Sequence, residues 1–200
     1  MARYSDSRRH PKVMTPDEQK RLLRVTGDHK SGYRDHVLFS LALATGLREH
    51  EIVALDVEDV YDIERGRSRH RVTLRKFKGS DGEKTQEILL STRIREKLDE
   101  YVKWLLTNRK GISQSLFASS RGSRLSTRQV RHAFAEWQKR AGFDRHLNFH
   151  SLRHTACSAI YRSTKDIMVT KQFARHKSIA TTAVYSHPTE EDLERAVESI

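Results

Sequence analysis

The chain has 200 residues, a length that suits one domain or one domain with short arms. Hydrophobic residues make up 36% of it, which is enough to build a core and excludes a fully disordered chain. Lysine and arginine number 38 against 26 acidic residues, and the formal charge of +12 favours a polyanionic partner over a merely basic protein.

The sequence contains one cysteine, Cys157, so it can form no internal disulfide and no thiolate metal cluster. This cysteine lies in an apolar run, where a buried thiol is expected and is typical of a reducing compartment. Residues 1–12 are polar and basic, unlike a secretory signal, and the longest apolar stretch, residues 37–44, is too short to cross a bilayer. We therefore expect a soluble, cytoplasmic protein without a membrane partner.

The first quarter of the chain predicts a basic flexible arm followed by helices. Residues 1–13 form the expected arm. Thr15, Pro16 and Glu18 then give the pattern of a capping box with proline at the first helical position, which predicts a helix to about residue 26. Further helices are predicted over residues 32–44 and 49–55, and Gly46 allows the chain to turn between them.

The middle of the chain changes from helical to alternating patterns. Residues 71–77 and 86–90 alternate in polarity around turn-rich residues 78–83, which predicts a β-hairpin. Helical patterns resume and predict helices over residues 92–108, 126–141, 151–161, 165–174, 179–185 and 189–200. The fold class predicted is therefore mainly α with a small antiparallel β-sheet (α+β).

Three segments place phosphate-binding side chains beside a possible nucleophile. The first is the Thr-Gly-Leu-Arg run that ends at Arg48, and the second is the His-x-x-Arg-His run that contains His150 and Arg153. In the third, His176 precedes Tyr185 by nine residues. Each alone has an ordinary interpretation as a surface residue or, for Tyr185, as a core aromatic. Their combination in this order is hard to obtain by chance.

With these motifs the sequence resembles the catalytic domain of the tyrosine recombinases, the phage integrase family, from about residue 15 onward. The family pattern is Arg, Lys, His-x-x-Arg, His or Trp, and Tyr. Its matches in this sequence are Arg48, Lys78, His150, Arg153, His176 and Tyr185. Lys78 precedes a glycine at the hairpin turn where the family's lysine belongs, although Lys76 and Lys84 border the same hairpin.

The resemblance implies a role for each matched residue. A phosphodiester under attack gains negative charge, and the two matched arginines are expected to stabilise it because guanidinium groups pair with its oxygens bidentately. Tyr185 is expected to attack and form a 3′-phosphotyrosyl bond, and Lys78 to protonate the leaving 5′ oxygen. His150 is expected to accept the phenol proton or bond a phosphate oxygen, and His176 to donate to such an oxygen.

Three neighbouring residues leave open alternatives. Glu51, one helical turn after Arg48, is interpreted either as orienting a histidine or arginine or as an ordinary solvated carboxylate. His154 follows His150 by one turn, but without a third ligand the pair does not predict a metal site, and no cofactor is expected. Arg175 stands where the family usually has glycine, so we expect a different local backbone or a contact with DNA phosphate.

A second basic cluster and the chain ends complete the domain prediction. The cluster surrounds a loop and a helix start and is predicted to contact DNA, with a solvated face as the alternative: Arg121, Arg124, Arg128 and Arg131. The catalytic domain is predicted over residues 14–188 with no separate N-terminal clamp domain, as in the single-domain invertases of the fimbrial-switch type. Residues 189–200 carry an apolar stripe that packs on its own domain or, as the resemblance favours, on a neighbouring protomer.

The resemblance implies a site-specific recombinase of double-stranded DNA that integrates, excises, inverts or resolves. Such an enzyme would act as a homo-oligomer, a tetrameric synapse on DNA, and would be a monomer or weak oligomer when free. Three alternatives remain. They are a type IB topoisomerase-like enzyme that relaxes one duplex, a DNA-binding regulator that has lost catalysis, and a basic RNA-binding protein, although no RNA-module signature supports the last.

Overall fold

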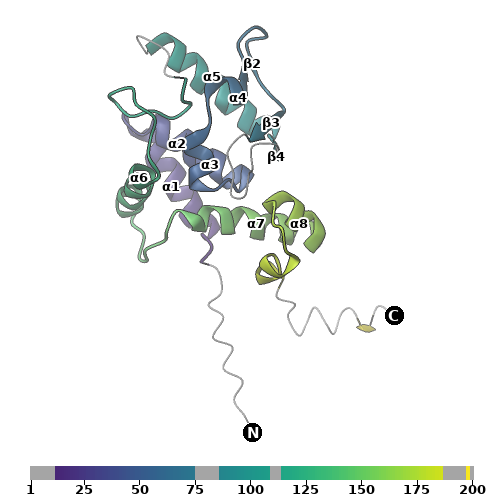
Figure 1. Cartoon of the computed structure of the whole chain (residues 1–200). Coiled ribbons are helices and arrows are strands. Elements are labelled where there is room, and N and C mark those ends of the chain that lie inside the picture. The colour runs from purple at the N-terminus through teal and green to yellow at the C-terminus, as the bar shows by residue number, and fades with distance from the viewer. Residues whose placement is uncertain (1–11, 75–85, 109–113, 187–196, 199–200) are drawn as a thin grey trace.

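The computed structural model describes residues 12–74, 86–108, 114–186 and 197–198, and this part of the chain is mainly helical (Figure 1). The α-helices are α1 (Pro16–Asp28), α2 (Tyr33–Thr45), α3 (Glu49–Ala54), α4 (Val57–Val60), α5 (Thr92–Asn108), α6 (Thr127–Arg140), α7 (His150–Thr164) and α8 (Ile167–Ala174). Two 3₁₀ turns follow, η1 (Ile179–Thr181) and η2 (Ala183–Tyr185). The strands are β1 (Tyr61–Asp62), β2 (Arg67–Ser68), β3 (Arg71–Leu74) and β4 (Gln86–Leu89).

The strands form two small antiparallel sheets, where the sequence predicted one. β3 pairs with β4 in a register that runs from Arg71 opposite Leu89 to Leu74 opposite Gln86, as the predicted hairpin requires. β1 pairs with β2 in a separate sheet. This sheet was missed because strands of two residues are too short to show alternation. The predicted hairpin turn, and Lys78 with it, lies outside the described residues.

Local capping signals set several helix boundaries. Thr15 Oγ1 accepts a hydrogen bond from the Glu18 N–H at 3.1 Å, and Glu18 Oε2 accepts one from the Thr15 N–H at 2.7 Å, which is the predicted capping box. Lys165 ends α7 in the left-handed conformation at φ 54°, so the prediction that a helix begins at residue 165 was wrong and α8 begins at Ile167. Residues 179–185 form two 3₁₀ turns where one helix was predicted.

The main core surrounds α2, which packs against α1, α5 and α7. Leucines of α2 and α5 lie in this core, and Leu41 and Leu98 have no exposed surface. Truncating either leucine to alanine would cost roughly 2–5 kcal/mol of stability, because a cavity would replace its contacts. No helix within the described residues has the length and apolar character that a membrane span needs.

A second, smaller cluster lies where α7, α8 and η2 meet. Cys157, Ala174 and Tyr185 are its buried members, with Tyr161 and Phe173 packed against them, and the burial of the free Cys157 thiol is as predicted. In Figure 1, α7 runs along the lower edge of the body and α8 packs at its far end. This cluster therefore packs α8 and η2 against α7.

The two ends of the chain lie largely beyond the described region. Residues 1–11 of the predicted arm are outside it. Of the helix predicted over residues 189–200, only residues 197–198 are described, and both are helical. Val197, a member of the predicted apolar stripe, is 62% exposed.

Candidate active site

Arg48 is held at the junction between α2 and α3. Gly46 ends α2 at φ 61°, and a Cβ atom there would lie 3.1 Å from the Phe173 ring, so both the backbone conformation and the space favour glycine. The Arg48 N–H donates to Glu51 Oε2 at 2.8 Å, and Arg48 Nη1 donates to Glu51 Oε1 at 2.8 Å. The predicted Thr-Gly-Leu-Arg run thus fixes the Arg48 guanidinium beside a buried carboxylate.

Arg153 is almost fully buried and joins two distant parts of the chain. It lies on α7 with 2% of its surface exposed. Its Nη1 donates to the Gly46 carbonyl at 2.5 Å, and its Nη2 donates to the Ala174 carbonyl. Burial, and then the charge of Arg48, lower the pKa of Arg153 to about 10, so the group is still ionised at neutral pH. Arg153 therefore ties the end of α2 to the end of α8.

A second link between distant parts of the chain is the ion pair between Glu51 on α3 and Arg175 at the end of α8. Arg175 Nη2 donates to Glu51 Oε2 at 2.7 Å, and the Glu51 side chain has no exposed surface. Burial raises the pKa of Glu51, but Arg175 and the hydrogen bonds and charge of Arg48 outweigh it and hold that pKa below its ordinary value. Glu51 consequently orients two arginines at once, and of the two interpretations given above the solvated carboxylate was wrong.

Arg175 adopts the left-handed conformation, with φ 54° and ψ 43°, that glycine would adopt more easily. The expectation of a different local backbone was therefore wrong, because the helix end keeps the conformation suited to glycine although the residue is arginine. The side chain is 6% exposed and is directed toward Glu51. Its contact with DNA phosphate stays a prediction.

The three arginines give the site a surplus of positive charge. Arg48 and Arg175 pair with the carboxylate of Glu51, whereas Arg153 bonds to two backbone carbonyls and has no ion pair among the described residues. The buried Nε and Nη1 atoms of Arg175 have no hydrogen-bond partner among the described residues. Buried guanidinium groups without a matching number of acids favour the binding of an anion.

Tyr185 is buried within its own chain, close enough to Arg153 and Arg48 to be influenced by their charges. It is 9% exposed and packs with Cys157 and Ala174. Its hydroxyl oxygen lies 2.8 Å from His154 Nδ1, and its ring stacks on the His176 ring at a centroid distance of 6.3 Å and an interplanar angle of 10°. Burial, and then the neighbouring Cys157 sulfur, raise the pKa of Tyr185, so the phenol is held protonated.

The three histidines around the site favour the neutral form. Burial lowers the pKa of His154 to about 4, with His150 as the next cause, and burial followed by Arg153 lowers that of His176 to about 4. His150 lies at the surface, where desolvation and then the charge of Arg153 lower its pKa. The His150 and His154 rings meet edge to face, 4.6 Å between centroids, and His176 Nδ1 lies 3.0 Å from Thr182 Oγ1.

His154 is the residue whose importance the sequence did not show. It was considered only as one half of a metal pair, yet it holds the hydroxyl of Tyr185. No group of three metal-binding side chains is found among the described residues. The available signal was its position one turn after His150, which places both rings on one face of α7. Which histidine meets the phenol depends on the path of η2, and that path could not be derived from spacing.

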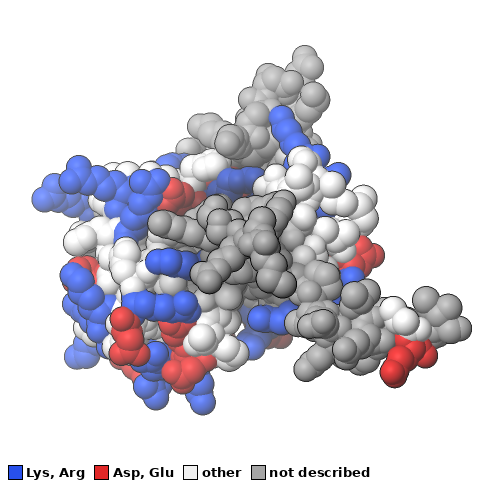
Figure 2. Space-filling model, turned by 90° about the horizontal axis from the view of Figure 1, so that it is seen from below, with Lys and Arg blue, Asp and Glu red and all other residues white. Residues whose placement is uncertain are grey.

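Two of the four arginines in the predicted basic cluster bond to other side chains or carbonyls of the described residues. Arg121 and Arg128 are exposed. Arg124 donates to the Val53 carbonyl at 2.8 Å and forms an ion pair with Asp56. The Nε and Nη2 atoms of Arg131 both donate to the Glu49 carboxylate. On the face drawn in Figure 2, Lys and Arg cover more of the described surface than Asp and Glu. Contact of these arginines with DNA stays a prediction.

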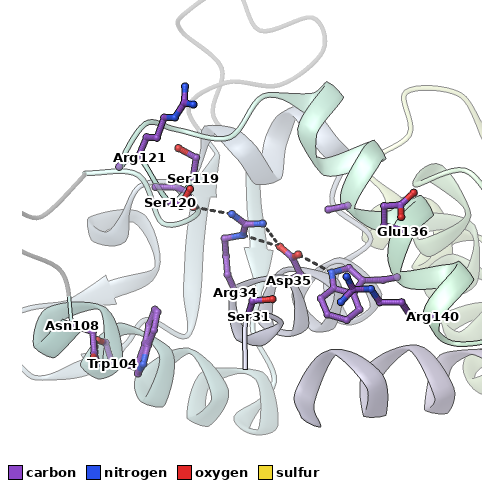
Figure 3. A pocket seen from close by; sticks show the side chains of 14 residues that line it. Ser31, Arg34, Asp35, Trp104, Asn108, Ser119, Ser120, Arg121, Glu136 and Arg140 are labelled. Atoms are coloured by element: carbon purple, nitrogen blue, oxygen red, sulfur yellow. Dashed lines mark hydrogen bonds and ion pairs between the residues drawn. The ribbon is translucent and has the colours of Figure 1, made fainter. Parts of the chain in front are cut away.

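A cavity of about 800 Å³ lies elsewhere, between α2, α5, α6 and the loop that contains Arg121 (Figure 3). Its buried charge is already paired, because Asp35 accepts from Arg34 Nε at 2.7 Å and from Trp137 Nε1 at 2.8 Å. The Arg140 guanidinium lies over the Trp137 ring, 4.8 Å from its centroid. The buried charge of this cavity is therefore paired, whereas buried nitrogens of Arg175 in the arginine site have no partner among the described residues.

The chain belongs to the phage integrase family, whose family model matches residues 12–192. It is 29% identical over 177 residues to tyrosine recombinase XerC of Vibrio cholerae, in an alignment that covers 88% of this chain and 54% of that relative. The chain thus spans about half the length of the curated relatives it matches.

Two solved structures show the same fold. The XerA recombinase superposes with a TM-score of 0.76 at 26% identity, covering 96% of this chain and 65% of that one. The catalytic domain of bacteriophage HP1 integrase superposes with a TM-score of 0.63 at 20% identity, covering 93% of both. The predicted fold class, a mainly α tyrosine recombinase catalytic domain with small antiparallel sheets, is confirmed.

Proposed function

We propose that this chain cleaves and rejoins double-stranded DNA through a 3′-phosphotyrosyl intermediate, as a site-specific recombinase. The observation that carries the proposal is the position of Tyr185, a phenol bonded to His154 within the arginine-rich site of its own chain. Family membership supports the same chemistry. We propose accordingly that the nucleophile is supplied in cis.

Binding of the scissile phosphate would use the surplus charge of the site. Two nitrogens of the Arg153 guanidinium donate to carbonyls, and one nitrogen of Arg48 donates to Glu51. Both guanidiniums therefore have further N–H groups that can donate to a phosphate. The transition state carries more negative charge than the bound phosphodiester, so these preorganised cations stabilise it more strongly than the ground state. Removing one such donor group typically costs about 100- to 1000-fold in rate.

In the cleavage step the Tyr185 oxygen bonds to phosphorus and the bond from phosphorus to the 5′ oxygen breaks. The leaving oxygen takes a proton, for which Lys78 is the proposed donor. His176 and His150 are proposed to donate hydrogen bonds to phosphate oxygens. The phosphotyrosyl bond conserves the energy of the broken bond, so the reverse step rejoins DNA without a cofactor.

A trapping experiment tests the proposal. The full chain is incubated with a library of randomised duplexes, each carrying a central nick, so that a short cleaved fragment diffuses away and the adduct accumulates. We expect a detergent-resistant protein–DNA adduct that forms equally in EDTA and is absent from Tyr185→Phe. If the wild-type chain gives no adduct with any duplex, or Tyr185→Phe gives the same amount, the proposed function is wrong.

The wider DNA contacts and the assembly are part of the same proposal. Arg121, Arg124, Arg128, Arg131 and Arg175 are proposed to contact DNA, and binding should weaken steeply with added salt because phosphate contacts release counterions. Residues 189–200 are proposed to dock on a neighbouring protomer in a tetrameric synapse. Deletion of residues 189–200 should abolish cooperative assembly on paired sites. Unchanged cooperativity would contradict the docking.

A further inference from the structure

The hydrogen bond between Tyr185 and His154 points to a role for a residue outside the predicted catalytic set. We propose that His154 Nδ1 accepts the phenol proton when Tyr185 attacks phosphorus. This inference rests on the cleavage function proposed above and deepens it. It moves the acceptor role from His150, to which the family resemblance gave it as one of two alternatives, to the histidine one turn further along α7.

Geometry favours His154 over the other two histidines. Its Nδ1 lies 2.8 Å from the Tyr185 oxygen, and in the tautomer with the proton on Nε2 it accepts the hydrogen bond from that hydroxyl. His176 lies parallel to the face of the Tyr185 ring, and its Nδ1 is bonded to Thr182. His150 contacts the His154 ring edge to face and is bonded to no phenol oxygen in the described residues.

The burial of Tyr185 strengthens the assignment. The side chain is 9% exposed, so few water molecules can reach the hydroxyl and compete as proton acceptors. His154 directly follows Arg153 on α7, and Arg153 holds this part of the helix through its bonds to two backbone carbonyls. A general base must lie within hydrogen-bond distance of the proton it takes, and His154 meets this condition before any substrate binds.

The surrounding charges keep the proton on Tyr185 until DNA arrives. The groups that face His154 are His150 and Arg153 from α7, His176 after α8 and Tyr185 from η2. The Cys157 thiol lies beside the Tyr185 hydroxyl, and Arg48, Glu51 and Arg175 form the adjoining network. Burial and these positive charges disfavour the imidazolium ion. A phosphodiester bound at the arginines brings negative charge, which raises the proton affinity of His154. The nucleophile is thus activated by its own substrate.

The step balances in atoms and charge. The proton leaves the Tyr185 oxygen for His154 Nδ1 as that oxygen bonds to phosphorus. The bond from phosphorus to the 5′ oxygen breaks, and the 5′ oxygen takes a proton from the general acid. In the rejoining step the 5′ hydroxyl attacks phosphorus and returns its proton to the deprotonated general acid. The bond from phosphorus to the Tyr185 oxygen breaks, and His154 returns its proton to the departing phenolate.

A His154→Asn variant separates proton transfer from positioning. Asparagine places an oxygen near the position of Nδ1, so it can still accept the hydrogen bond from Tyr185, but it cannot take the proton. Single-turnover adduct formation is followed from pH 6 to 9 on a nicked duplex recovered from the library. His146→Asn, at an exposed histidine outside the site, is the matched control.

We expect His154→Asn to slow cleavage about 100-fold at pH 7. Its rate should then rise about tenfold per pH unit, because the phenol must lose its proton to hydroxide, whereas the wild-type rate levels off. A duplex with sulfur in place of the bridging 5′ oxygen needs no proton on its leaving group. It should therefore leave His154→Asn slow while rescuing a Lys78→Ala variant.

A second variant guards against an effect of folding. His154→Ala leaves space for a ring, and added imidazole should restore cleavage in proportion to the concentration of its neutral form. Wild-type rate and pH profile in His154→Asn, rescue of that variant by the sulfur duplex, or no response of His154→Ala to imidazole would each overturn the assignment. Absence of any wild-type adduct would instead overturn the proposed function, so the two failures are distinguishable.

Discussion

The arginine site and the cavity of Figure 3 both contain buried charge, but they balance it differently. In the cavity, Asp35 accepts hydrogen bonds from Arg34 and from the Trp137 N–H, and the Arg140 guanidinium lies over the Trp137 ring. In the arginine site, Glu51 pairs with Arg48 and Arg175, Arg153 bonds to carbonyls, and two nitrogens of Arg175 lack partners among the described residues. The cavity offers about 800 Å³ of space, whereas the site offers unbalanced charge.

Charge balance therefore distinguishes the candidate active site from the cavity better than volume does. A duplex is too large for an enclosed cavity, and its phosphates bind to cations on a surface. Two sets of bonds position these cations. Arg153 donates to the carbonyls of Gly46 and Ala174, and Glu51 accepts from Arg48 and Arg175. Substitutions in these bonded side chains should therefore affect cleavage far more than equivalent substitutions in the cavity.

The largest effect is expected from Arg153→Lys. Lysine keeps the charge but lacks the planar fork that reaches two carbonyls and still presents donors to phosphate. Single-turnover cleavage should fall about 1000-fold. Arg140→Lys, the same change over Trp137 in the cavity, should alter cleavage less than about twofold. Equal losses in the two variants would break the contrast between the regions.

The next largest effect is expected from Glu51→Gln. The substitution preserves shape but removes the only carboxylate that Arg48 and Arg175 contact in the described structure. We expect a loss of about 3 kcal/mol in unfolding free energy from leaving buried charges unpaired, and slower cleavage because Arg48 is no longer fixed. Urea denaturation and adduct kinetics measure both. Glu136→Gln at the cavity rim serves as control, and a stability loss matching that of Glu51→Gln would contradict the account.

Substitutions at Arg175 separate the energetic cost of its left-handed backbone from the stability that its ion pair with Glu51 contributes. Arg175→Ala loses the pair with Glu51 and keeps a side chain at φ 54°, whereas Arg175→Gly loses the pair but relieves the backbone. Arg175→Gly should therefore be more stable than Arg175→Ala by about 1 kcal/mol, in thermal or urea unfolding. Both should bind DNA more weakly than wild type. Equal stability of the two variants would show that the left-handed backbone carries no cost here.

The smallest effect is expected from pH. His154 and His176 have pKa values lowered to about 4, so between about pH 6.5 and 4 the unfolded chain binds protons at these residues that the folded chain does not. Protons then favour unfolding, and stability falls as the pH falls through this window. Each histidine should contribute on the order of 1 kcal/mol, since both are partly exposed. Substituting His132, an exposed histidine, should leave the slope unchanged.

The sequence predicted the elements better than their contacts. The capping box at Thr15 and the spacing of apolar residues in α5 placed these helices correctly, because such signals are local. The order of Arg48, His150, Arg153, His176 and Tyr185 indicated the family because it can be recognised along the chain without knowledge of any tertiary contact. The partner of Tyr185 and the pairing of Arg175 with Glu51 could not be predicted, because they depend on how α7, α8 and η2 pack.

The predicted DNA-contact arginines show the same limit. Arg121 and Arg124 stand three residues apart and are both exposed, yet Arg124 also bonds to Val53, Leu55 and Asp56. A charge pattern indicates that a surface is basic, but it cannot show which cations have internal partners. Only the tertiary contacts separate a phosphate-binding arginine from a structural one.

The central claim is that Tyr185, and no other residue, becomes attached to the 3′ end of the cleaved strand. Mass spectrometry of the trapped adduct after proteolysis, with DNA labelled separately at each end, measures it directly. We expect a nucleotide attached through a 3′ phosphate to the peptide that contains Tyr185, with the Tyr185 hydroxyl as the site of attachment. A 5′ linkage, or attachment to any other residue, would contradict it.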